Sequence, residues 1–267
     1  MEGINIEDSW DFPLRRTFSL KITILTWNMQ GADSKDPYKQ GNKINTLKRW
    51  IGCFSEPFVM CIQESGRHAF INDAINDGSL QLVDNRGVYK GTIRMGSRLE
   101  LFVLFYEDAD AGNNRCSLAV ITRAEYTTKE TRVIWHETDD GLRPSLGIKI
   151  KDADNLEIFS HHAPSSEARF AASYSINQLD DVSAGNGYNK FVYAGDFNCS
   201  PIELEKKFGR KPWKCTCSSK ETHKSGGRID YVVTPENSDI NLVIPPAAIK
   251  GDNLSSDHYP QFFEYTT

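Results

Sequence analysis

The chain has no long apolar runs, which excludes a protein that crosses a membrane with helices. Its 267 residues contain no hydrophobic stretch much longer than Leu101–Tyr106, far below the roughly 20 residues that a spanning helix needs. Met1–Ser9 is polar, and the stretch after Arg16 is broken by Lys21, so the N-terminus lacks the apolar segment of a secretory signal. We expect a soluble protein whose compartment the sequence leaves open.

Cysteine and net positive charge are also scarce. Six cysteines are too few for a disulfide scaffold at this length, and their spacing shows no paired zinc-ligand motif. The net charge of −5 excludes binding to nucleic acid through overall positive charge. A local basic face is still allowed, because eight Lys and Arg residues lie between Lys206 and Arg228, against Glu221 alone. The alternative for this stretch is a solvated lysine-rich loop.

The hydrophobic pattern predicts many strands and few helices. We expect helices at Lys43–Phe54, Arg67–Ile75 and Ser166–Val182, and strands at Leu20–Trp27, Phe58–Gln63, Leu99–Tyr106, Ser117–Thr122, Arg132–Trp135, Ser145–Ile150, Leu156–His162, Phe191–Ala194, Ile229–Val233 and Pro260–Tyr265. Asn85–Arg98 and Lys206–Lys224 are expected to be loops. This content is typical of an α+β fold with two packed sheets and outer helices.

No repeat and no Pro- or Ser-rich linker divides the chain. We therefore expect residues 20–267 to form a single domain behind an N-terminal extension, residues 1–19, with little structure.

Polar, reactive residues follow four of the apolar strands, and two more polar groups lie late in the chain. Because side chains at strand ends of a sheet sandwich can converge on one rim, we expect a shared site there. The residues concerned are Asn28, Glu64, His161–His162, Asp196–Asn198, Arg228–Asp230 and Ser256–His258. Taken singly, each of these groups would more often be a turn, cap or surface residue, and their joint occurrence favours a site.

Four of these side chains suit magnesium. Glu64 and Asp257 offer anionic oxygens, and Asn28 and Asn198 offer neutral carbonyl oxygens. Mg²⁺ takes few protein ligands of this kind and keeps waters that a phosphate can replace, whereas zinc prefers thiolate and imidazole.

The remaining residues suit proton transfer. His162 and His258 can titrate near neutral pH, Asp230 can fix the tautomer of one histidine, and Asp196 can orient or deprotonate a water. His161 and His162 are adjacent, so a strand would send them to opposite faces and only one should enter the site. Together these groups predict metal-assisted hydrolysis of a phosphate ester.

This joint pattern resembles the endonuclease/exonuclease/phosphatase superfamily, the group of pancreatic deoxyribonuclease. The resemblance rests on Trp27-Asn28, Gln63-Glu64, His162-Ala163-Pro164, Gly195-Asp196-Phe197-Asn198, Arg228-Ile229-Asp230-Tyr231 and Ser256-Asp257-His258-Tyr259-Pro260. Finer features are similar to the B subunit of cytolethal distending toxins, in Trp27–Gly31, Ala111–Arg115, Arg143–Ile148 and Thr222–Gly226. Two departures from the toxin pattern are His162-Ala163-Pro164, which is closer to the deoxyribonucleases, and Cys199, which replaces an arginine.

The resemblance implies a four-layer α/β/β/α sandwich of the deoxyribonuclease-like type and Mg²⁺-dependent phosphodiester cleavage, with Mn²⁺ or Ca²⁺ as substitutes. It implies that Glu64 is the principal metal ligand, assisted by Asn28 and Asp257. His258 would pair with Asp230 and act on the attacking water or the phosphate.

By the same resemblance, His162 would be the second catalytic histidine, and Asp196 and Asn198 would position water and phosphate. Arg115 and Arg143, with Asn198, would bind DNA phosphates. Glu100 would orient a histidine.

The leading hypothesis is a Mg²⁺-dependent DNA endonuclease that nicks duplex DNA as the catalytic subunit of a distending-type genotoxin. Such a toxin would be secreted, carried by delivery and receptor-binding subunits, and active in the host nucleus. The alternative is a phosphoinositide phosphatase on the same scaffold, which Gly226–Ile229 disfavours because inositol phosphatases usually carry a Trp-Cys-Asp-Arg type segment there. A non-catalytic binding module is the third possibility.

Overall fold

A computed structural model describes residues 19–30, 37–66, 69–108, 116–138, 141–165, 167–185, 190–243 and 256–267. Within these ranges the strands form two sheets. The larger has eight strands in the order β13 (Asp239–Leu242), β14 (Gln261–Thr266), β1 (Lys21–Asn28), β2 (Phe58–Gln63), β6 (Leu118–Arg123), β5 (Leu99–Tyr106), β4 (Val88–Met95) and β3 (Leu80–Asp84). The smaller has six, in the order β11 (Trp213–Thr216), β12 (Asp230–Pro235), β10 (Phe191–Asp196), β9 (Glu157–His162), β8 (Gly141–Ile150) and β7 (Thr127–Thr138).

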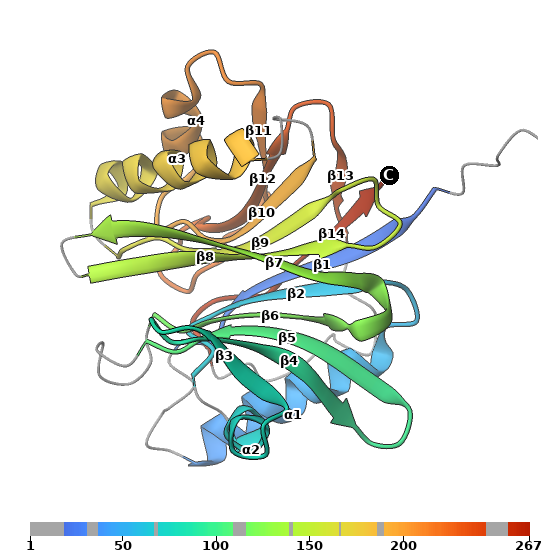
Figure 1. Ribbon diagram of the computed structural model, residues 1–267. Coiled ribbons are helices and arrows are strands. Elements are labelled where there is room, and N and C mark those ends of the chain that lie inside the picture. Colours follow the sequence, from blue (N-terminus) through green and yellow to red (C-terminus); the bar gives the residue numbers. More distant parts are fainter. Residues whose placement is uncertain are drawn as a thin grey trace, which may run out of the picture.

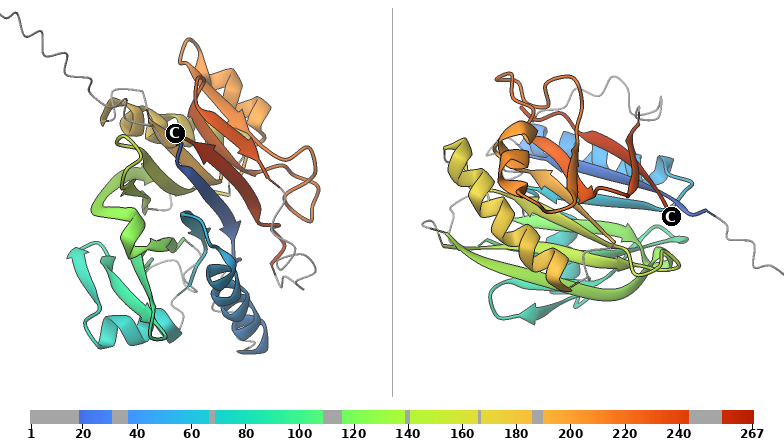
Figure 2. Two further views of the ribbon diagram at one scale, coloured as in Figure 1. Left: turned by 90° about the vertical axis from the view of Figure 1, so that its right-hand side faces the viewer. Right: turned by 90° about the horizontal axis from the view of Figure 1, so that it is seen from above.

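Helices cover the outer face of each sheet (Figures 1 and 2). The larger sheet is covered by α1 (Pro37–Cys53) and α2 (Ala69–Asn76), and the smaller by α3 (Ala168–Gly185) and α4 (Pro201–Phe208), while a short 3-10 turn, η1 (Ala124–Tyr126), precedes β7. The predicted α+β, four-layer α/β/β/α architecture is therefore confirmed. None of the described helices is long and apolar enough to cross a membrane.

The two faces of each strand serve two different cores. In β1, Ile22 and Ile24 pack in the core between the sheets, whereas Leu25 and Trp27 pack against α1. Because strand side chains alternate, every second residue of the central strands points into the gap between the sheets. This alternation decides which polar residues meet at the strand ends.

The predicted elements are largely found, and β2 and β5 have the predicted bounds. The expected loops at Asn85–Arg98 and Lys206–Lys224 were wrong: β4 fills most of the first, and the end of α4 and all of β11 lie in the second. The start of α4 has a signal in the sequence, since the Ser200 hydroxyl accepts from the backbone N–H of Glu203 and the Glu203 carboxylate accepts from the backbone N–H of Ser200. Residues 1–18 of the expected extension lie outside the described residues.

Candidate active site

The smaller sheet places three predicted residues side by side. Asp196, at the end of β10, pairs in register with His162 of parallel β9 and with Asp230 of antiparallel β12. The preceding inward residues of β10, Val192 and Ala194, belong to the core between the sheets. Asp196 continues that face, so the three polar side chains line one end of the gap between the sheets.

The larger sheet brings Asn28 and Glu64 to the same end. Asn28 of β1 pairs in register with Gln63 of β2, and the Gln63 Nε2 donates to Ser160 Oγ of β9 at 3.0 Å, which ties the two sheets together. Glu64 follows Gln63 and has a φ of +46°, in the left-handed region that side chains disfavour. This backbone turn directs the Glu64 carboxylate back toward Asn28.

The Asp196 carboxylate lies at the centre of the site. Its Oδ2 accepts from Asn28 Nδ2 at 2.9 Å and lies 3.8 Å from His162 Nε2 and 3.7 Å from His258 Nε2. His162 Nε2 also lies 3.9 Å from Glu64 Oε1. The two histidines therefore approach Asp196 from β9 and from the C-terminal segment, and His162 bridges Asp196 and Glu64.

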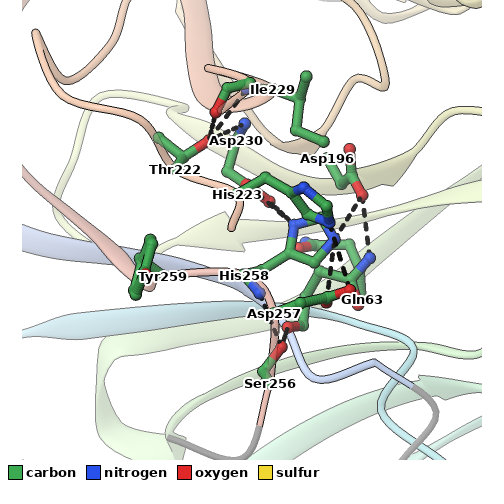
Figure 3. A network of polar contacts seen from close by, with 12 residues as sticks. Gln63, Asp196, Thr222, His223, Ile229, Asp230, Ser256, Asp257, His258 and Tyr259 are labelled. Atoms are coloured by element: carbon green, nitrogen blue, oxygen red, sulfur yellow. Dashed lines mark hydrogen bonds and ion pairs between the residues drawn. The ribbon is translucent and has the colours of Figure 1, made fainter. Parts of the chain in front are cut away.

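His258 is held in one orientation by Asp230. The ring Nδ1 lies 3.0 Å from both Asp230 carboxylate oxygens, so Nε2 is turned toward Asp196 (Figure 3). The Ser256 hydroxyl donates to the Asn28 carbonyl at 2.7 Å and accepts from the His258 backbone N–H at 3.1 Å. Ser256 thus fixes the C-terminal segment to the end of β1.

Burial and charge shift the pKa values of three of these groups, and burial raises that of Asp230. Burial, reinforced by the Asp230 carboxylate, raises the pKa of Asp196 to about 7. Burial lowers the pKa of His258, but the hydrogen bond and charge of Asp230, with the charges of Asp196 and Asp257, outweigh it and raise that pKa to about 9. At neutral pH His258 is therefore a cation beside a carboxyl group that can exchange a proton.

Asn28 presents its amide nitrogen, not its oxygen, to the carboxylates. Its Nδ2 donates to Asp196 and, at 3.3 Å, to Glu64 Oε1, while its Oδ1 accepts from the Gln30 backbone N–H at 2.8 Å. The backbone N–H can only donate, so the orientation of the amide is set by this contact. In this arrangement the Asn28 nitrogen, rather than its oxygen, faces Glu64 and Asp196. The expectation that Asn28 assists the metal ligands stays a prediction.

Two residues that the sequence analysis did not single out hold Asp257. Gln30 Nε2 donates to Asp257 Oδ2 at 2.7 Å, and the Asp257 backbone N–H donates to Gln30 Oε1 at 3.1 Å. His223 Nε2 lies 3.3 Å from the same Oδ2. The signal for both residues was their position in the toxin-like segments Trp27–Gly31 and Thr222–Gly226, which alone assigns no role to either.

The loop that carries His223 is joined by several hydrogen bonds to the segments that carry Asp230 and His258. Thr222 Oγ1 accepts from the backbone N–H groups of Ile229 and Asp230, and the Thr222 carbonyl accepts from the Tyr259 N–H at 2.7 Å (Figure 3). These bonds set the position of Asp230 relative to His258.

Asn198 and Gly195 fix the backbone on either side of Asp196. The Asn198 backbone N–H donates to Asp196 Oδ1 at 2.9 Å, and its Nδ2 donates to the Ala163 carbonyl at 2.8 Å, from a backbone φ of +49°. A side chain at Gly195 would place its Cβ 2.0 Å from the His161 carbonyl oxygen, so only glycine allows β9 and β10 to lie this close.

The prediction that only one of the adjacent histidines enters the site is confirmed. His161 points the other way, into a fully buried polar network in which its Nε2 contacts Ser175 Oγ at 2.9 Å and its Nδ1 contacts Tyr193 Oη at 2.7 Å. Burial lowers the pKa of His161 to about 3, so the ring is neutral.

Two other predicted residues lie away from the centre of this cluster, and a third is outside the described residues. Arg143 is half-buried at the start of β8, next to the end of β9. Arg115 lies outside the described residues. Glu100 lies near the start of β5, in an exposed ion pair with Arg94 at 2.9 Å. The opposite end of β5 pairs with the start of β6, which in turn pairs with the end of β2 next to the site. Glu100 is therefore too far along β5 to orient His162 or His258.

Comparison with solved structures shows the same fold in several proteins. A chain of cytolethal distending toxin from Actinobacillus actinomycetemcomitans is 21% identical, with a TM-score of 0.67 over 90% of this chain and 97% of that chain. CdtB, the biologically active subunit of cytolethal distending toxin, is 20% identical, with a TM-score of 0.67 over 90% and 96%. The human Nocturnin catalytic domain with bound sulfate is 13% identical, with a TM-score of 0.59 over 93% and 94%.

These identities establish similarity of fold alone. No curated protein sequence matches the chain. The sequence model of the Endonuclease/Exonuclease/phosphatase family matches residues 25–258, which include every residue of the cluster. The chain therefore belongs to the Endonuclease/Exonuclease/phosphatase family, whose members are hydrolases of phosphate esters that generally require a divalent metal ion.

Proposed function

We propose that this protein is a Mg²⁺-dependent DNA endonuclease that hydrolyses phosphodiester bonds and nicks duplex DNA, as the catalytic subunit of a genotoxin of the distending type. The observation that carries the proposal is the placement of two imidazole Nε2 atoms within 3.8 Å of one buried carboxylate oxygen, Asp196 Oδ2. Family membership supplies the reaction class, and the structural similarity to the distending toxins favours this member of it.

The donor set fits magnesium. Glu64 and Asp257 carry carboxylates at the rim of the cluster, and Asp257 Oδ1 is buried and accepts no hydrogen bond from the described residues. Carboxylate oxygens with room for water are the ligands that Mg²⁺ prefers. Glu64 and Asp257 would hold the ion, which would supply positive charge to a phosphate oxygen.

The chain's own residues would move the proton. A water held by Asp196 and Asn198 attacks phosphorus and gives its proton to the Asp196 carboxylate, whose raised pKa suits this role. One P–O ester bond breaks. Cationic His258 donates a hydrogen bond to a non-bridging oxygen as negative charge develops there. His162, on the other side of Asp196, gives a proton to the leaving oxygen as the ester bond breaks.

Duplex DNA as substrate is favoured by the charge around the cluster. Arg143 lies beside the end of β9, and the loop after β11 carries Lys220, Lys224 and Arg228. The Lys224 backbone N–H donates to the Asp257 carbonyl at 2.8 Å, so this basic loop borders the site directly. Basic side chains along one edge can bind successive phosphates of a duplex backbone.

A nicking assay tests the proposal. Supercoiled plasmid should become open-circular in Mg²⁺ and stay supercoiled with a chelator. A parallel reaction measures phosphate released from a soluble inositol polyphosphate. Phosphate release without nicking would replace the endonuclease by the phosphatase, and no turnover of either substrate with Mg²⁺, Mn²⁺ or Ca²⁺ would reject both in favour of a binding module.

A matched pair of histidine variants tests the site. His162→Gln should lower the nicking rate by about 10²–10⁴-fold, the usual contribution of one proton-transfer group. His136→Gln removes a partly exposed imidazole on β7 and should nick like the wild type. Equal rates for the two variants would contradict the assigned role of His162. Cells that express the wild-type chain in the nucleus should accumulate DNA breaks, and cells that express His162→Gln should not.

A further inference from the structure

Three side chains with metal-binding atoms meet at the edge of the cluster, and one of them, His223, has no part in the proposed hydrolysis. His223 Nε2 lies 3.3 Å from Asp257 Oδ2, and His258 Nε2 lies 3.7 Å from Asp257 Oδ1. One ligand atom from each residue lies within 4.8 Å of the other two. The two histidine rings pack edge to face with their centroids 4.5 Å apart, so their nitrogens share one side of the site.

These separations match the shell of a small tetrahedral ion. Zinc binds imidazole nitrogen and carboxylate oxygen at about 2.0–2.1 Å, so neighbouring ligands around it lie about 3.3–3.4 Å apart. His223 Nε2 is at that distance from Asp257 Oδ2, and His258 Nε2 lies 3.7 Å from the other carboxylate oxygen, Oδ1. One ligand atom of each residue lies within 4.8 Å of the other two, so the side chains would move closer together to complete three corners of the tetrahedron.

Both histidines are held from behind, and His258 is held in the way that metal-ligating histidines are held. The Nδ1 of His258 is bound by the Asp230 carboxylate, which leaves Nε2 as the outward atom. The Nδ1 of His223 contacts both the backbone N–H and the hydroxyl of Ser225. The backbone N–H can only donate, so His223 Nδ1 accepts from it at 3.1 Å and the ring proton lies on Nε2 in the absence of metal. Zinc binding at Nε2 must therefore displace this proton, and a shift of the proton to Nδ1 would place it beside the Ser225 hydroxyl.

The Asp257 carboxylate is also held by hydrogen bonds from outside this group of three ligands. Asp257 Oδ2 accepts from Gln30 Nε2 at 2.7 Å, and the backbone N–H of Asp257 donates back to the Gln30 side chain at 3.1 Å. The backbone bridge between His223 and His258 holds the two histidine-bearing segments together. The three ligands are therefore preorganised by contacts outside the cluster.

We propose that His223, Asp257 and His258 form a second cation site that binds zinc in preference to magnesium and inhibits the enzyme. Two imidazoles and one carboxylate are a ligand set that zinc prefers and magnesium disfavours. Three protein ligands leave a fourth position for water. The site is separate from the Glu64 side of the cluster but shares Asp257 with the magnesium ligands.

Inhibition follows from the shared atoms, and this part rests on the proposed function. A zinc ion on His258 Nε2 would displace the proton of this nitrogen into solvent and so remove the hydrogen bond that it donates to the phosphate. Its bond to Asp257 would remove one carboxylate from magnesium. Zinc at site-saturating concentration should therefore stop hydrolysis in the presence of excess Mg²⁺.

Direct binding of Zn²⁺ to the full chain tests the site without using activity. Calorimetric titration should show one zinc per chain, and His223→Gln should weaken this binding by at least about 100-fold, since loss of outer-shell partners alone costs 10–100-fold. Glutamine can still donate to Asp257, so the carboxylate keeps its position. His136→Gln is the matched control and should bind zinc like the wild type. Unchanged affinity in His223→Gln would overturn the proposal.

The position of the ion gives a second measurement that needs no variant. Anomalous diffraction from zinc-soaked crystals should show a peak between the three ligands, and Co²⁺ in place of Zn²⁺ should give the visible spectrum of a tetrahedral site without a thiolate charge-transfer band. A peak or thiolate band at the free thiols, such as Cys215 and Cys217, would place the ion elsewhere and refute the site. If the wild type binds zinc here but hydrolyses no phosphate ester, the proposed function fails and the zinc site stands.

Discussion

Replacing Asp230 by asparagine tests the histidine pair with a change of almost no volume. In the wild type both Asp230 oxygens lie 3.0 Å from His258 Nδ1, and this contact, with the charges of Asp196 and Asp257, raises the His258 pKa to about 9 against the effect of burial. Asparagine removes the negative charge, whereas the burial of the ring remains. The His258 pKa in Asp230→Asn should therefore fall to its ordinary value near 6.5 or below.

The size of the effect follows from that shift. A change of about 2.5 pKa units corresponds to about 3 kcal/mol in favour of the protonated ring. At pH 8 about nine-tenths of the wild-type rings and about one in thirty of the variant rings would be protonated, a deficit of about 30-fold. Loss of ring orientation adds a factor that does not depend on pH, so the total at pH 8 should lie within the range of about 10²–10⁴.

The pH dependence of the rate separates the loss of ring protonation from the loss of ring orientation. The protonated ring is the active form, so the alkaline limb of the wild-type profile should lie near pH 9 and that of the variant at or below pH 6.5. The deficit should grow about tenfold per pH unit between those values and shrink toward pH 6.

Two measurements check this prediction. Nicking rates at saturating Mg²⁺ from pH 5.5 to 9.5 give the limbs, and NMR titration of the histidine Cε1–H signals without metal gives the pKa itself. Asp181→Asn is the control, because it removes an exposed carboxylate 3.8 Å from His136 and should leave the profile unchanged. A constant deficit at every pH, with an unshifted His258 signal, would refute the role assigned to Asp230.

Three further predictions concern the scaffold and the substrate. Gly195→Ala should destabilise the fold by about 3 kcal/mol, because the new Cβ would lie 2.0 Å from a backbone oxygen. Gly52→Ala in α1, where no atom lies within 4 Å of the new Cβ, should stabilise the fold by about 0.5–1 kcal/mol. Urea unfolding of the two variants measures both free energies. The folded pKa of His161 is near 3, below its unfolded value, so its contribution to stability is present above pH 6.5 and falls by about 1.4 kcal/mol per pH unit below that. The free energy of unfolding of His161→Gln should therefore fall less steeply with decreasing pH than that of the wild type. Parallel slopes would contradict the assignment. Arg143→Ala should raise KM for plasmid more than it lowers kcat and reduce the salt slope by about one unit; an unchanged slope would exclude a phosphate contact.

The central strands and their polar ends could be predicted from the sequence because both depend on local patterns. The run Phe58–Gln63 is apolar and rich in β-formers, and it forms β2 with those bounds. Period-two alternation was enough to separate His162 from His161. The placement of His162 in the site and of His161 outside it follows from the strand period alone.

The features that were missed depend on distant contacts or on the backbone. The residues of β4 alternate weakly and include Gly91, where a side chain would meet the Ser79 carbonyl at 1.8 Å, so this strand is specified by its neighbours rather than by its own pattern. The direction of the Asn28 amide depends on a backbone N–H two residues later. His223 joins the site only because Thr222 and Lys224 bond to a segment more than thirty residues away in sequence.

The register of β10 determines both the packing and the chemistry of the site. A shift of one residue would turn Asp196 away from the gap between the sheets and send Phe197 toward it. Against such a shift, Phe197 stacks on Tyr231 with centroids 4.1 Å apart in the outer core, and Gly195 fits under the His161 carbonyl, where no larger residue can. Gly195 and Phe197 flank Asp196 on either side in sequence. Mutations that loosen this packing should therefore lower activity before they unfold the chain, because Asp196 must meet two histidines within 3.8 Å.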